Sequence, residues 1–521
     1  MRESRMIGFA SSGVLALAAH AAPVVTVLHT KIAGHPTSSI PGTRDLNGAL
    51  VPSEIKAMED IVLNPRDSGA WLLKARTTLG ADLETVMIAR RGGVTNALMQ
   101  EGQFAPGGDP SHRFDFFGSA MGRFNTIGDY VFCFRARTGV TGSTYPADGQ
   151  RVAVWDGTNI VVRLKQGDLV SGLMDTGATG DEKVGNSVGS AHLLDSGAIG
   201  TQDSTTTGIS TTRRPVLMYN VAGFKQSNLS TLLDINGVSR TWTTFLANFF
   251  YTTVDGAHWA ALGRHSGQTS SDDMLAKDGV AVLQSGTAIV ASGVIVEDIF
   301  NFVLLNNGDW YARGDVTGSN DWFAKNGVLL AKTGDPIVPG STEHWGPIFY
   351  AMHANNNGDY VLAGNTDDPN TGRNSVVVLN GQTVIVREGD RLDLNGNGQL
   401  DDDVYIGRTT PDNDSFDADG IQIADDGTVL MMVNIRNNDG QEYNVVPAFG
   451  SPSALIKITP GSDCPPCAAD YNNDGGITGE DVAAFFDDFE NGRPCADVNL
   501  DGGITGEDVA AFFVPFEAGS C

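Results

Sequence analysis

The sequence predicts an all-β body made of repeated strand units, followed by a small α-helical domain at the C-terminus. Through residues 51–458, short apolar runs alternate with turns rich in Asn, Asp and Gly, which is typical of antiparallel hairpins. From residue 459 onward the pattern changes. The segment DGGITGEDVAAFF occurs at 474–486 and again at 501–513, and each copy ends in apolar residues at helical spacing.

Composition excludes some classes of partner. The chain has 521 residues, of which 41% are hydrophobic, enough to bury a large core. Its 34 basic and 62 acidic residues give a net charge of −28. Because phosphate binding relies on Lys and Arg, we expect no nucleic acid partner and no attraction to anionic membranes.

Residues 1–21 predict a secretory signal peptide. Arg2 and Arg5 supply the positive start, the apolar run 7–19 follows, and Ala19-His20-Ala21 forms a small-x-small cleavage site. A short membrane anchor is the alternative, but a spanning helix needs roughly 20 apolar residues. We therefore expect a secreted protein, extracellular or at the cell surface, with no transmembrane segment in the mature chain.

Residues 22–50 predict an N-terminal strand and a linker. The segment PVVTVLHT has the character of a spare outer strand, which would help to close the body or cover one of its edges.

Each unit of the body, 51–458, has an apolar strand, a turn with Gly and a second strand, and most units add two short strands. The turn glycines are Gly69, Gly128, Gly197, Gly256, Gly308, Gly358 and Gly427. Four strands in a repeat of roughly 50 residues are typical of a propeller blade, so we predict a seven-bladed β-propeller-like body. A β-sandwich array or a β-solenoid is the alternative. The units also resemble secreted bacterial propeller-like repeat proteins, and that resemblance implies no activity.

No catalytic residues can be assigned in the body. Asp168, Asp335 and Asp390 recur after Gly at one place in the repeat, which indicates turn capping. The histidines, including His258, His265, His344 and His353, lie outside any catalytic motif and are predicted to be surface or strand residues. Four tryptophans are predicted to be core residues, with a sugar-binding face as the alternative: Trp155, Trp310, Trp322 and Trp345.

The body also contains a loop with calcium-ligand spacing. Asp393, Asn395, Asn397 and Asp401 occupy loop positions 1, 3, 5 and 9. Position 12 is Val404, so the closing ligand is missing unless Asp402 or Asp403 replaces it. This loop is a possible third calcium site.

The duplicated C-terminal segment predicts two calcium-binding loops. Oxygen-bearing side chains at positions 1, 3, 5, 9 and 12, with Gly at position 6 and a carbonyl at position 7, match an EF-type loop. The first ligand set is Asp470, Asn472, Asp474, Gly476, Thr478 and Asp481. The second is Asp497, Asn499, Asp501, Gly503, Thr505 and Asp508.

A helix is predicted after each loop, with Thr478 and Thr505 as N-caps. Pro515 is expected to end or kink the second helix. The predicted apolar faces are Val482, Phe485, Phe486 and Phe489 in one helix, and Val509, Phe512, Phe513 and Phe516 in the other.

Four cysteines flank the loops: Cys464, Cys467, Cys495 and Cys521. In an exported module they predict two disulfides. Three connectivities are open, and Cys464–Cys521 with Cys467–Cys495 would clasp the two copies together. Zinc is an alternative for Cys464 and Cys467, although no second cysteine or histidine pair follows. Cys133 is expected to be buried in a strand.

A duplicated loop and helix without an entering helix resembles a dockerin, of the variant that carries cysteines near both ends. The resemblance covers 459–521 and implies calcium-dependent folding and docking to a cohesin. Dockerins typically have hydroxyl residues at positions 10 and 11, whereas this chain has Gly479-Glu480 and Gly506-Glu507. The partner is therefore expected to be a different cohesin-like receptor or a cell-surface anchoring protein.

The function predicted from the sequence is binding or surface assembly, with carbohydrate as a possible ligand of the body. The alternative is a dockerin-bearing carbohydrate-active enzyme, a glycoside hydrolase or lyase, that acts in extracellular polysaccharide breakdown. A deep central pocket with two carboxylates roughly 5 to 9 Å apart would favour the enzyme.

Overall fold

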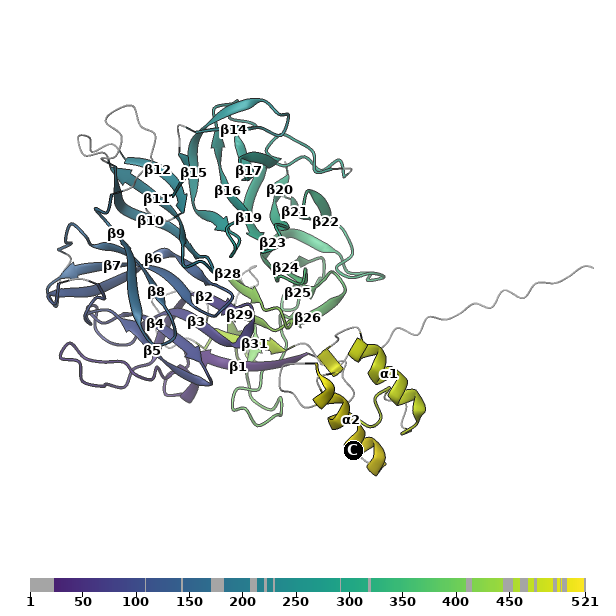
Figure 1. Cartoon of the computed structure of the whole chain (residues 1–521). Helices are drawn as coiled ribbons and strands as arrows, with labels where there is room; N and C mark the ends of the chain where they lie inside the picture. The colour runs from purple at the N-terminus through teal and green to yellow at the C-terminus, as the bar shows by residue number, and fades with distance from the viewer. Residues whose placement is uncertain are drawn as a thin grey trace, which may run out of the picture. The chain divides into compact units, whose positions relative to one another are not determined.

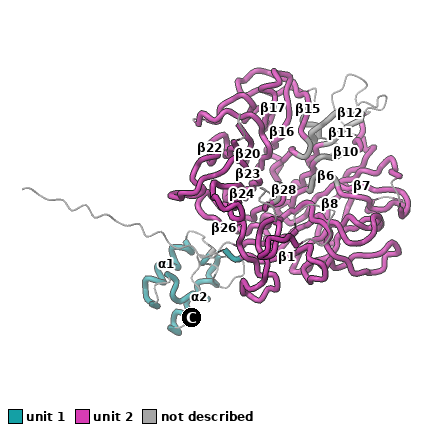
Figure 2. The backbone as a smooth tube through the Cα atoms, turned by 180° about the vertical axis from the view of Figure 1, so that it is seen from behind, with its two compact units in different colours: residues 1–24, 460–521 teal, residues 25–459 magenta. Residues whose placement is uncertain are grey.

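The computed structural model separates the chain into two compact units. Its described residues are 23–107, 109–141, 144–169, 182–206, 213–219, 223–227, 230–290, 292–316, 320–408, 415–443, 453–459, 467–472, 476–490, 494–496, 498 and 504–519. One unit is Val25–Thr459, and the other contains the residues from Pro460 onward (Figure 2). The predicted signal peptide lies outside the described residues.

The body consists of antiparallel sheets that follow one another along the chain (Figure 1). The first three sheets are β2 (Ile55–Asn64), β3 (Asp67–Thr77), β4 (Thr85–Arg91) and β5 (Val94–Gln100); β6 (His112–Phe124), β7 (Tyr130–Thr138), β8 (Gln150–Trp155) and β9 (Ile160–Lys165); and β10 (Lys183–Leu193), β11 (Ile199–Thr206), β12 (Arg213–Tyr219) and β13 (Gly223–Ser227).

The fourth sheet has five strands, because β14 pairs with both β15 and β18. It consists of β14 (Thr231–Leu233), β15 (Ser239–Thr252), β16 (Trp259–His265), β17 (Asp273–Lys277) and β18 (Val280–Gln284). The next two sheets are β19 (Asp298–Leu304), β20 (Trp310–Val316), β21 (Asn320–Lys325) and β22 (Val328–Lys332); and β23 (Trp345–Ala354), β24 (Tyr360–Thr366), β25 (Ser375–Leu379) and β26 (Thr383–Arg387).

The last sheet joins the two ends of the body. Its order is β1-β31-β29-β28, so the N-terminal strand is its outer strand, as the sequence predicts. Its strands are β28 (Phe416–Ile423), β29 (Val429–Val433), β31 (Ala454–Thr459) and β1 (Val24–Thr30). Smaller elements are the ribbon of β27 (Tyr405–Ile406) and β30 (Ile435–Arg436) and the 3-10 turn η1 (Pro36–Ser38).

The core lies between neighbouring sheets. Each pair of successive sheets shares an apolar cluster, and one cluster joins the last sheet to the first by packing Leu430, Met432 and Leu455 against Ile55, Ile61 and Leu73. The sheets therefore close into a ring, and the body is a β-propeller. This arrangement excludes the β-sandwich array and the β-solenoid.

Six of the seven predicted turn glycines lie in turns between two paired strands and have positive φ angles, from 72° at Gly256 to 90° at Gly358. Gly69 is the exception and that prediction is wrong, because Gly69 lies within β3. The turn there is shorter and contains Pro65 and Arg66, so no residue with positive φ is needed.

The C-terminal unit contains α1 (Gly479–Glu490), the 3-10 turn η2 (Pro494–Ala496) and α2 (Gly506–Ala518). The predicted apolar faces form one cluster, and at its centre the equivalent residues Phe485 and Phe512 stack with ring centroids 4.3 Å apart. Thr505 caps α2 in a capping box with Asp508, as predicted.

The prediction for Pro515 is wrong in one respect, because α2 continues through it to Ala518. Pro515 lies in the last turn, where its missing N–H removes a single helical hydrogen bond. The helix then ends at Gly519, whose φ of 61° is the left-handed conformation that favours glycine.

None of the helices in the described residues has the length and apolar character needed to cross a membrane.

Candidate functional site

The turns after β2, β6, β10, β15, β19, β23 and β28 are linked from one sheet to the next by hydrogen bonds. In six of these seven turns, the backbone N–H at one position donates to the same position of the next turn, with donor–acceptor distances between 2.6 and 3.2 Å. The acceptor is the side chain of Asp195, Asn306, Asn356 or Asp425, and it is the backbone carbonyl where the residue is Val254 or Pro65. We call these residues the turn ring: Pro65, Thr126, Asp195, Val254, Asn306, Asn356 and Asp425.

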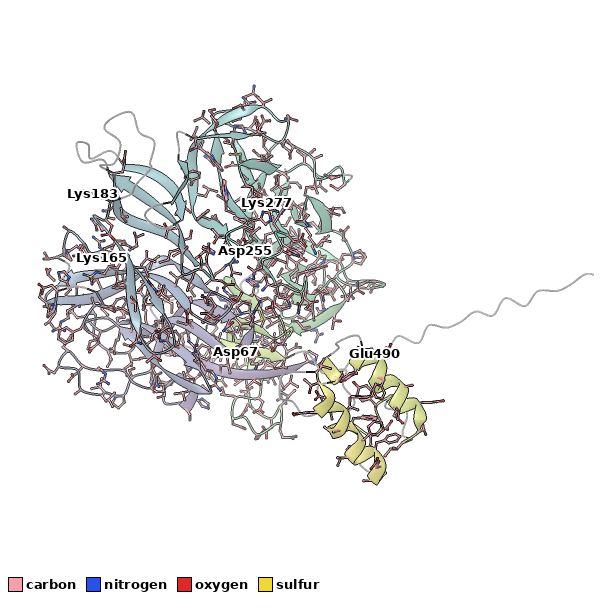
Figure 3. The ribbon with its side chains drawn as sticks, viewed as in Figure 1. Asp67, Lys165, Lys183, Asp255, Lys277 and Glu490 are labelled. Atoms are coloured by element: carbon pink, nitrogen blue, oxygen red, sulfur yellow. The ribbon has the colours of Figure 1, made fainter. Side chains whose placement is uncertain are left out.

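The chain of bonds stops at Pro65, which has no N–H to donate to Thr126. The Asn and Asp residues of the repeated turns therefore join neighbouring sheets. Asp255, labelled in Figure 3, lies in one of these turns, between β15 and β16, and accepts from Thr253 and Ala257 of the same turn.

The residue three positions before each member of the turn ring lies in the strand that leads into that turn. These strands, β2, β6, β10, β15, β19, β23 and β28, converge in the middle of the body (Figure 1). We call these residues the inner ring: Val62, Arg123, His192, Tyr251, Val303, His353 and Gln422. All but Tyr251 line a cavity of about 80 Å³, and Tyr251 contacts Arg123.

Arg123 supplies positive charge to this cavity. It lies deep in the body, and part of its side chain remains accessible at the cavity. Its Nη1 donates to the Leu304 carbonyl over 3.5 Å, and its Cζ lies 4.0 Å from the centroid of the Tyr251 ring. Burial lowers the pKa of Arg123 from its usual value.

Two histidines of the inner ring are neutral. Burial, with a smaller contribution from the charge of Arg123, lowers the pKa of His353 to about 3 and moves the pKa of His192 well below its usual value. His353 Nδ1 accepts the N–H of Ile423 at 3.3 Å, so the proton of the neutral ring is on Nε2. The ring of His192 packs edge-on against Tyr251, 5.0 Å between centroids.

The described residues that line the cavity include two arginines, Arg66 and Arg123, and no Asp or Glu. Asp195 and Asp425 each lie three residues after a residue that lines the cavity. Their carboxylates accept hydrogen bonds from the neighbouring turns and are not part of the lining. The carboxylate pair that would favour a glycosidase is thus not found among the described lining residues.

The predicted turn caps are confirmed. Lys165, Lys332 and Arg387 donate their backbone N–H groups to Asp168, Asp335 and Asp390, at 2.7, 3.0 and 2.8 Å. The predicted core tryptophans, Trp155, Trp310, Trp322 and Trp345, are all buried, as is Cys133 in β7.

The histidines named in the sequence are dispersed. His258 and His344 are near the surface and pair with Asp278 and Asp367, at 2.7 and 3.0 Å. His265 is buried at the end of β16, and His353 is the one of these four histidines that lines the central cavity, where His192 also lies.

The body loop at 393–403 is held by its own acids. Asp393 accepts the N–H groups of Gly396 and Gly398, both at 2.7 Å. Asp402 accepts the N–H of Asn395 at 3.0 Å, and the closing Asp481 of the first C-terminal loop accepts the N–H of Asn472 at the same distance. Each of these acids accepts the N–H of the residue at position 3 of its loop. Asp402 therefore corresponds to the closing Asp481, in place of the ligand that Val404 at position 12 lacks. The third calcium site, at Asp393, Asn395, Asn397 and Asp401, stays a prediction.

In the C-terminal unit, Asp481 and Asp508 are buried at the N-termini of α1 and α2, each with 0% exposed surface. Asp481 also accepts the N–H of Thr478 at 2.7 Å, and Asp508 accepts the N–H of Thr505 at 2.8 Å. Burial raises the pKa of Asp481, but backbone N–H groups, first that of Thr478, outweigh this effect and lower it.

The described part of the chain has no group of three or more His, Cys, Asp or Glu side chains placed to hold a metal. Asp470, Asn472, Gly476, Thr478, Asp481, Thr505 and Asp508 are described. The other predicted ligands and two of the cysteines lie outside the described residues: Asp474, Asp497, Asn499, Asp501, Gly503, Cys464 and Cys521.

No family model and no curated protein sequence matches this chain. Among solved structures, it is similar to the β-propeller domain of Cps50 (Swd1) from Myceliophteria thermophila, with 9% identity, 78% of this chain and 99% of that chain covered, and a TM-score of 0.33. The polysaccharide lyase Uly1 has 12% identity, 85% and 97% coverage and a TM-score of 0.34. The Dos1 propeller has 9% identity, 81% and 95% coverage and a TM-score of 0.34. At this level of likeness the comparisons say nothing of ligand or activity.

Sequence reasoning missed Arg123, His192 and Tyr251. A signal was present, because the same position five residues before the turn glycine holds Arg, His, Tyr, Val, His and Gln in the last six sheets. A position that accepts valine in one repeat and arginine in another is under no common structural demand.

Proposed function

We propose that this protein is an exported binding protein, which a calcium-dependent C-terminal domain tethers to a cohesin-like or cell-surface anchoring partner outside the cell. The observation that carries the proposal is the burial of Asp481 and Asp508 at the closing position of two equivalent loops. A buried carboxylate is unfavourable unless hydrogen bonds or a cation offset its charge.

The donor set fits calcium. The described ligands of the first loop are the carboxylates of Asp470 and Asp481, the amide of Asn472, the hydroxyl of Thr478 and the carbonyl of Gly476, which are all hard oxygens. When bound, the ion supplies the positive charge that lets these acids lie together. The residues of the chain set the loop shape, since Asp481 holds the N–H groups of positions 3 and 9.

The equivalent halves support a docking role. Phe485 and Phe512 stack across the centre, so the copies present similar surfaces in two orientations. Glu480 and Glu507 are exposed in the first turns of α1 and α2, at the positions where dockerins are read. Acids there support a partner with a basic surface. Cys464, Cys467, Cys495 and Cys521 are proposed to form two disulfides that clasp the halves.

The test is a double substitution, Asp470→Ala with Asp497→Ala, in the full chain. We expect calcium stoichiometry to fall by two ions per chain and capture of the partner from the cell envelope to be lost, while the melting of the body is unchanged. Glu490→Ala is the matched control, because Glu490 is exposed at the end of α1, outside the loops (Figure 3). Unchanged stoichiometry in the double variant would contradict the ligand assignment.

No observation favours the glycoside hydrolase as a second function. Glycoside hydrolysis needs two carboxylates on one substrate, and the described lining of the central cavity supplies none.

A further inference from the structure

The inner ring contains polar groups that the fold itself does not require. Val62 and Val303 occupy the same position as Arg123 in their own sheets, so a propeller strand accepts an aliphatic side chain there. Gln422 has a structural explanation, because it accepts from the N–H of Leu63 and donates to the carbonyl of Ile61, both at 2.8 Å. His353 and His192 each have one backbone partner, the N–H of Ile423 and the carbonyl of Phe250, and Tyr251 bonds the side chain of Arg123. The charge of Arg123 is the feature that the sheet itself does not require.

The charge of Arg123 is only partly compensated within the described residues. Its partners there are the Leu304 carbonyl, at the long distance of 3.5 Å, and Tyr251, through the face of its ring and a side-chain hydrogen bond, and both partners are uncharged. The described lining of the cavity has no carboxylate, although the chain as a whole has a net charge of −28. A guanidinium deep in a protein is costly unless an anion or a full set of acceptors faces it.

The cavity also presents hydrogen-bond donors. Thr252 Oγ1 is buried without a hydrogen-bond partner among the described residues, in a side chain with 6% exposed surface that lines the cavity. His353 contributes an N–H at Nε2, since its Nδ1 accepts from Ile423. A cation combined with neutral donors matches a ligand group that only accepts hydrogen bonds.

We propose that the central cavity binds a carboxylate group, held by the guanidinium of Arg123 with support from Thr252 and His353. A carboxylate is planar and accepts at both oxygens, which matches the donor fork of an arginine. The volume of about 80 Å³ holds the head of one small acid. The carboxylate belongs either to a free small acid or to a uronic acid sugar. This site is in the body and does not depend on the calcium tether.

The experiment measures the melting temperature and calorimetric binding of the full chain at fixed free calcium and ionic strength. The ligands are acetate and glucuronate, with acetamide and glucose as neutral counterparts of the same shape. We expect both acids to bind and to raise the melting temperature of the body, and their neutral counterparts to have no effect. Tighter binding of glucuronate than of acetate would identify an acidic sugar, and equal binding would identify a site for the carboxylate alone.

Arg123→Gln is the variant, because glutamine keeps a donor for the Leu304 carbonyl and removes the charge. Loss of a charged hydrogen-bond pair should weaken acid binding by about tenfold or more. Arg264→Gln is the control, because Arg264 is exposed and pairs with Asp273 away from the cavity. Equal acid binding by Arg123→Gln and the wild type would overturn the proposal. If Arg123→Gln does not fold, the wild-type chain alone tests the proposal. An equal response to acetate and acetamide, or no response to acetate and glucuronate, would overturn it.

Discussion

At the scale of the single residue, Asp321 has an unusual environment for an acid. It has 7% exposed surface at the start of β21, where its Oδ2 accepts the N–H of Phe349 at 2.6 Å. Burial raises the pKa of Asp321 from 3.8 to about 6, although the Phe349 N–H and the charge of Arg313 favour the ionised form. The folded body therefore binds this proton more tightly than the unfolded chain does.

This shift predicts how the stability of the body depends on pH. Below pH 4 the group is protonated in both states and has no effect, and as pH rises toward 6 the folded state loses stability. At neutral pH the ionised Asp321 costs about 3 kcal/mol, the free energy that corresponds to the difference between the two pKa values.

Asp321→Asn should remove this dependence, because the amide oxygen still accepts from Phe349 and carries no charge. Denaturant unfolding between pH 4 and 7 should show the variant gaining stability over the wild type as pH rises. Asp309→Asn is the control, and its difference from the wild type should stay constant over this range. Hydrogen bonds, first that from Asn326, lower the pKa of Asp309 from 3.8, so this acid is ionised in both states above pH 4. A constant difference between wild type and Asp321→Asn across this range would refute the assignment.

The role of a single residue could be predicted where the residue lies in a short sequence pattern that recurs from one repeat to the next. Asp168, Asp335 and Asp390 follow Gly at the ends of short strands, and the turn alone defines what their carboxylates bind. Arg123 and His353 come together only because strands far apart in sequence converge, which no local pattern describes. The sequence shows that both residues occupy the same position of the repeat. That this position lies at the centre of the body follows only once the sheets are known to close into a ring.

At the scale of the element, the turns hold the sheets together as well as connecting strands. The sequence indicated Asn/Asp-rich turns and their glycines, and local propensity accounts for these. The links from turn to turn were not predictable, since each one depends on the spacing of two adjacent sheets. The misplacement of Gly69 has the same origin, because Pro65 permits a tighter turn while still supplying the carbonyl that accepts from Asp425.

Asn356 makes the most extensive link in the turn ring. Its Oδ1 accepts from Asn306, its N–H donates to Asp425, and its Nδ2 contacts both oxygens of Asp425 at 3.2 and 3.3 Å. Asn356→Ala should lower the stability of the body by about 1 kcal/mol, because the partly buried N–H of Asn306 and carboxylate of Asp425 lose a partner.

The matched control is Asn307→Ala. Asn307 lies in the equivalent turn between β19 and β20, and among the described residues its side chain forms hydrogen bonds with Asp309 of the same turn alone. Chemical denaturation of both variants should show the larger loss for Asn356→Ala. Equal losses would mean that the links between turns contribute nothing beyond the turns themselves.

At the scale of the whole molecule, composition and repeats predicted an all-β body, a helical C-terminal domain and a closing N-terminal strand. These features follow from periodicity, which is a property of the chain alone. The strand order of the last sheet, in which β1 pairs with β31, depends on the ring closing. Ring closure depends on the packing of all the sheets together, which no local pattern describes. For the predicted calcium loops, by contrast, ligand spacing is local, so this prediction names its residues without reference to the fold.

The closing strand β1 is predicted to contribute more to the body than its outer position suggests. Val25 and Val27 pack against the cluster between the last two sheets, whereas Leu28 packs against the cluster between the last sheet and the first. His29 is buried with its ring edge-on to Trp71, 5.5 Å between centroids. The strand therefore contacts both junctions that complete the ring.

Deletion of residues 24–30 should lower the free energy of unfolding of the body by at least about 3 kcal/mol, because several apolar side chains lose their buried environment and a sheet edge is exposed. Deletion of the residues from Pro460 onward is the control, and it should leave the melting of the body unchanged, since those residues belong to the other compact unit. Leu28→Ala provides a milder test of the same junction and should fall between the two. If deletion of the strand is as harmless as deletion of the C-terminal domain, then the ring is stable without β1 and closure depends on the contacts between Leu430, Met432 and the first sheet.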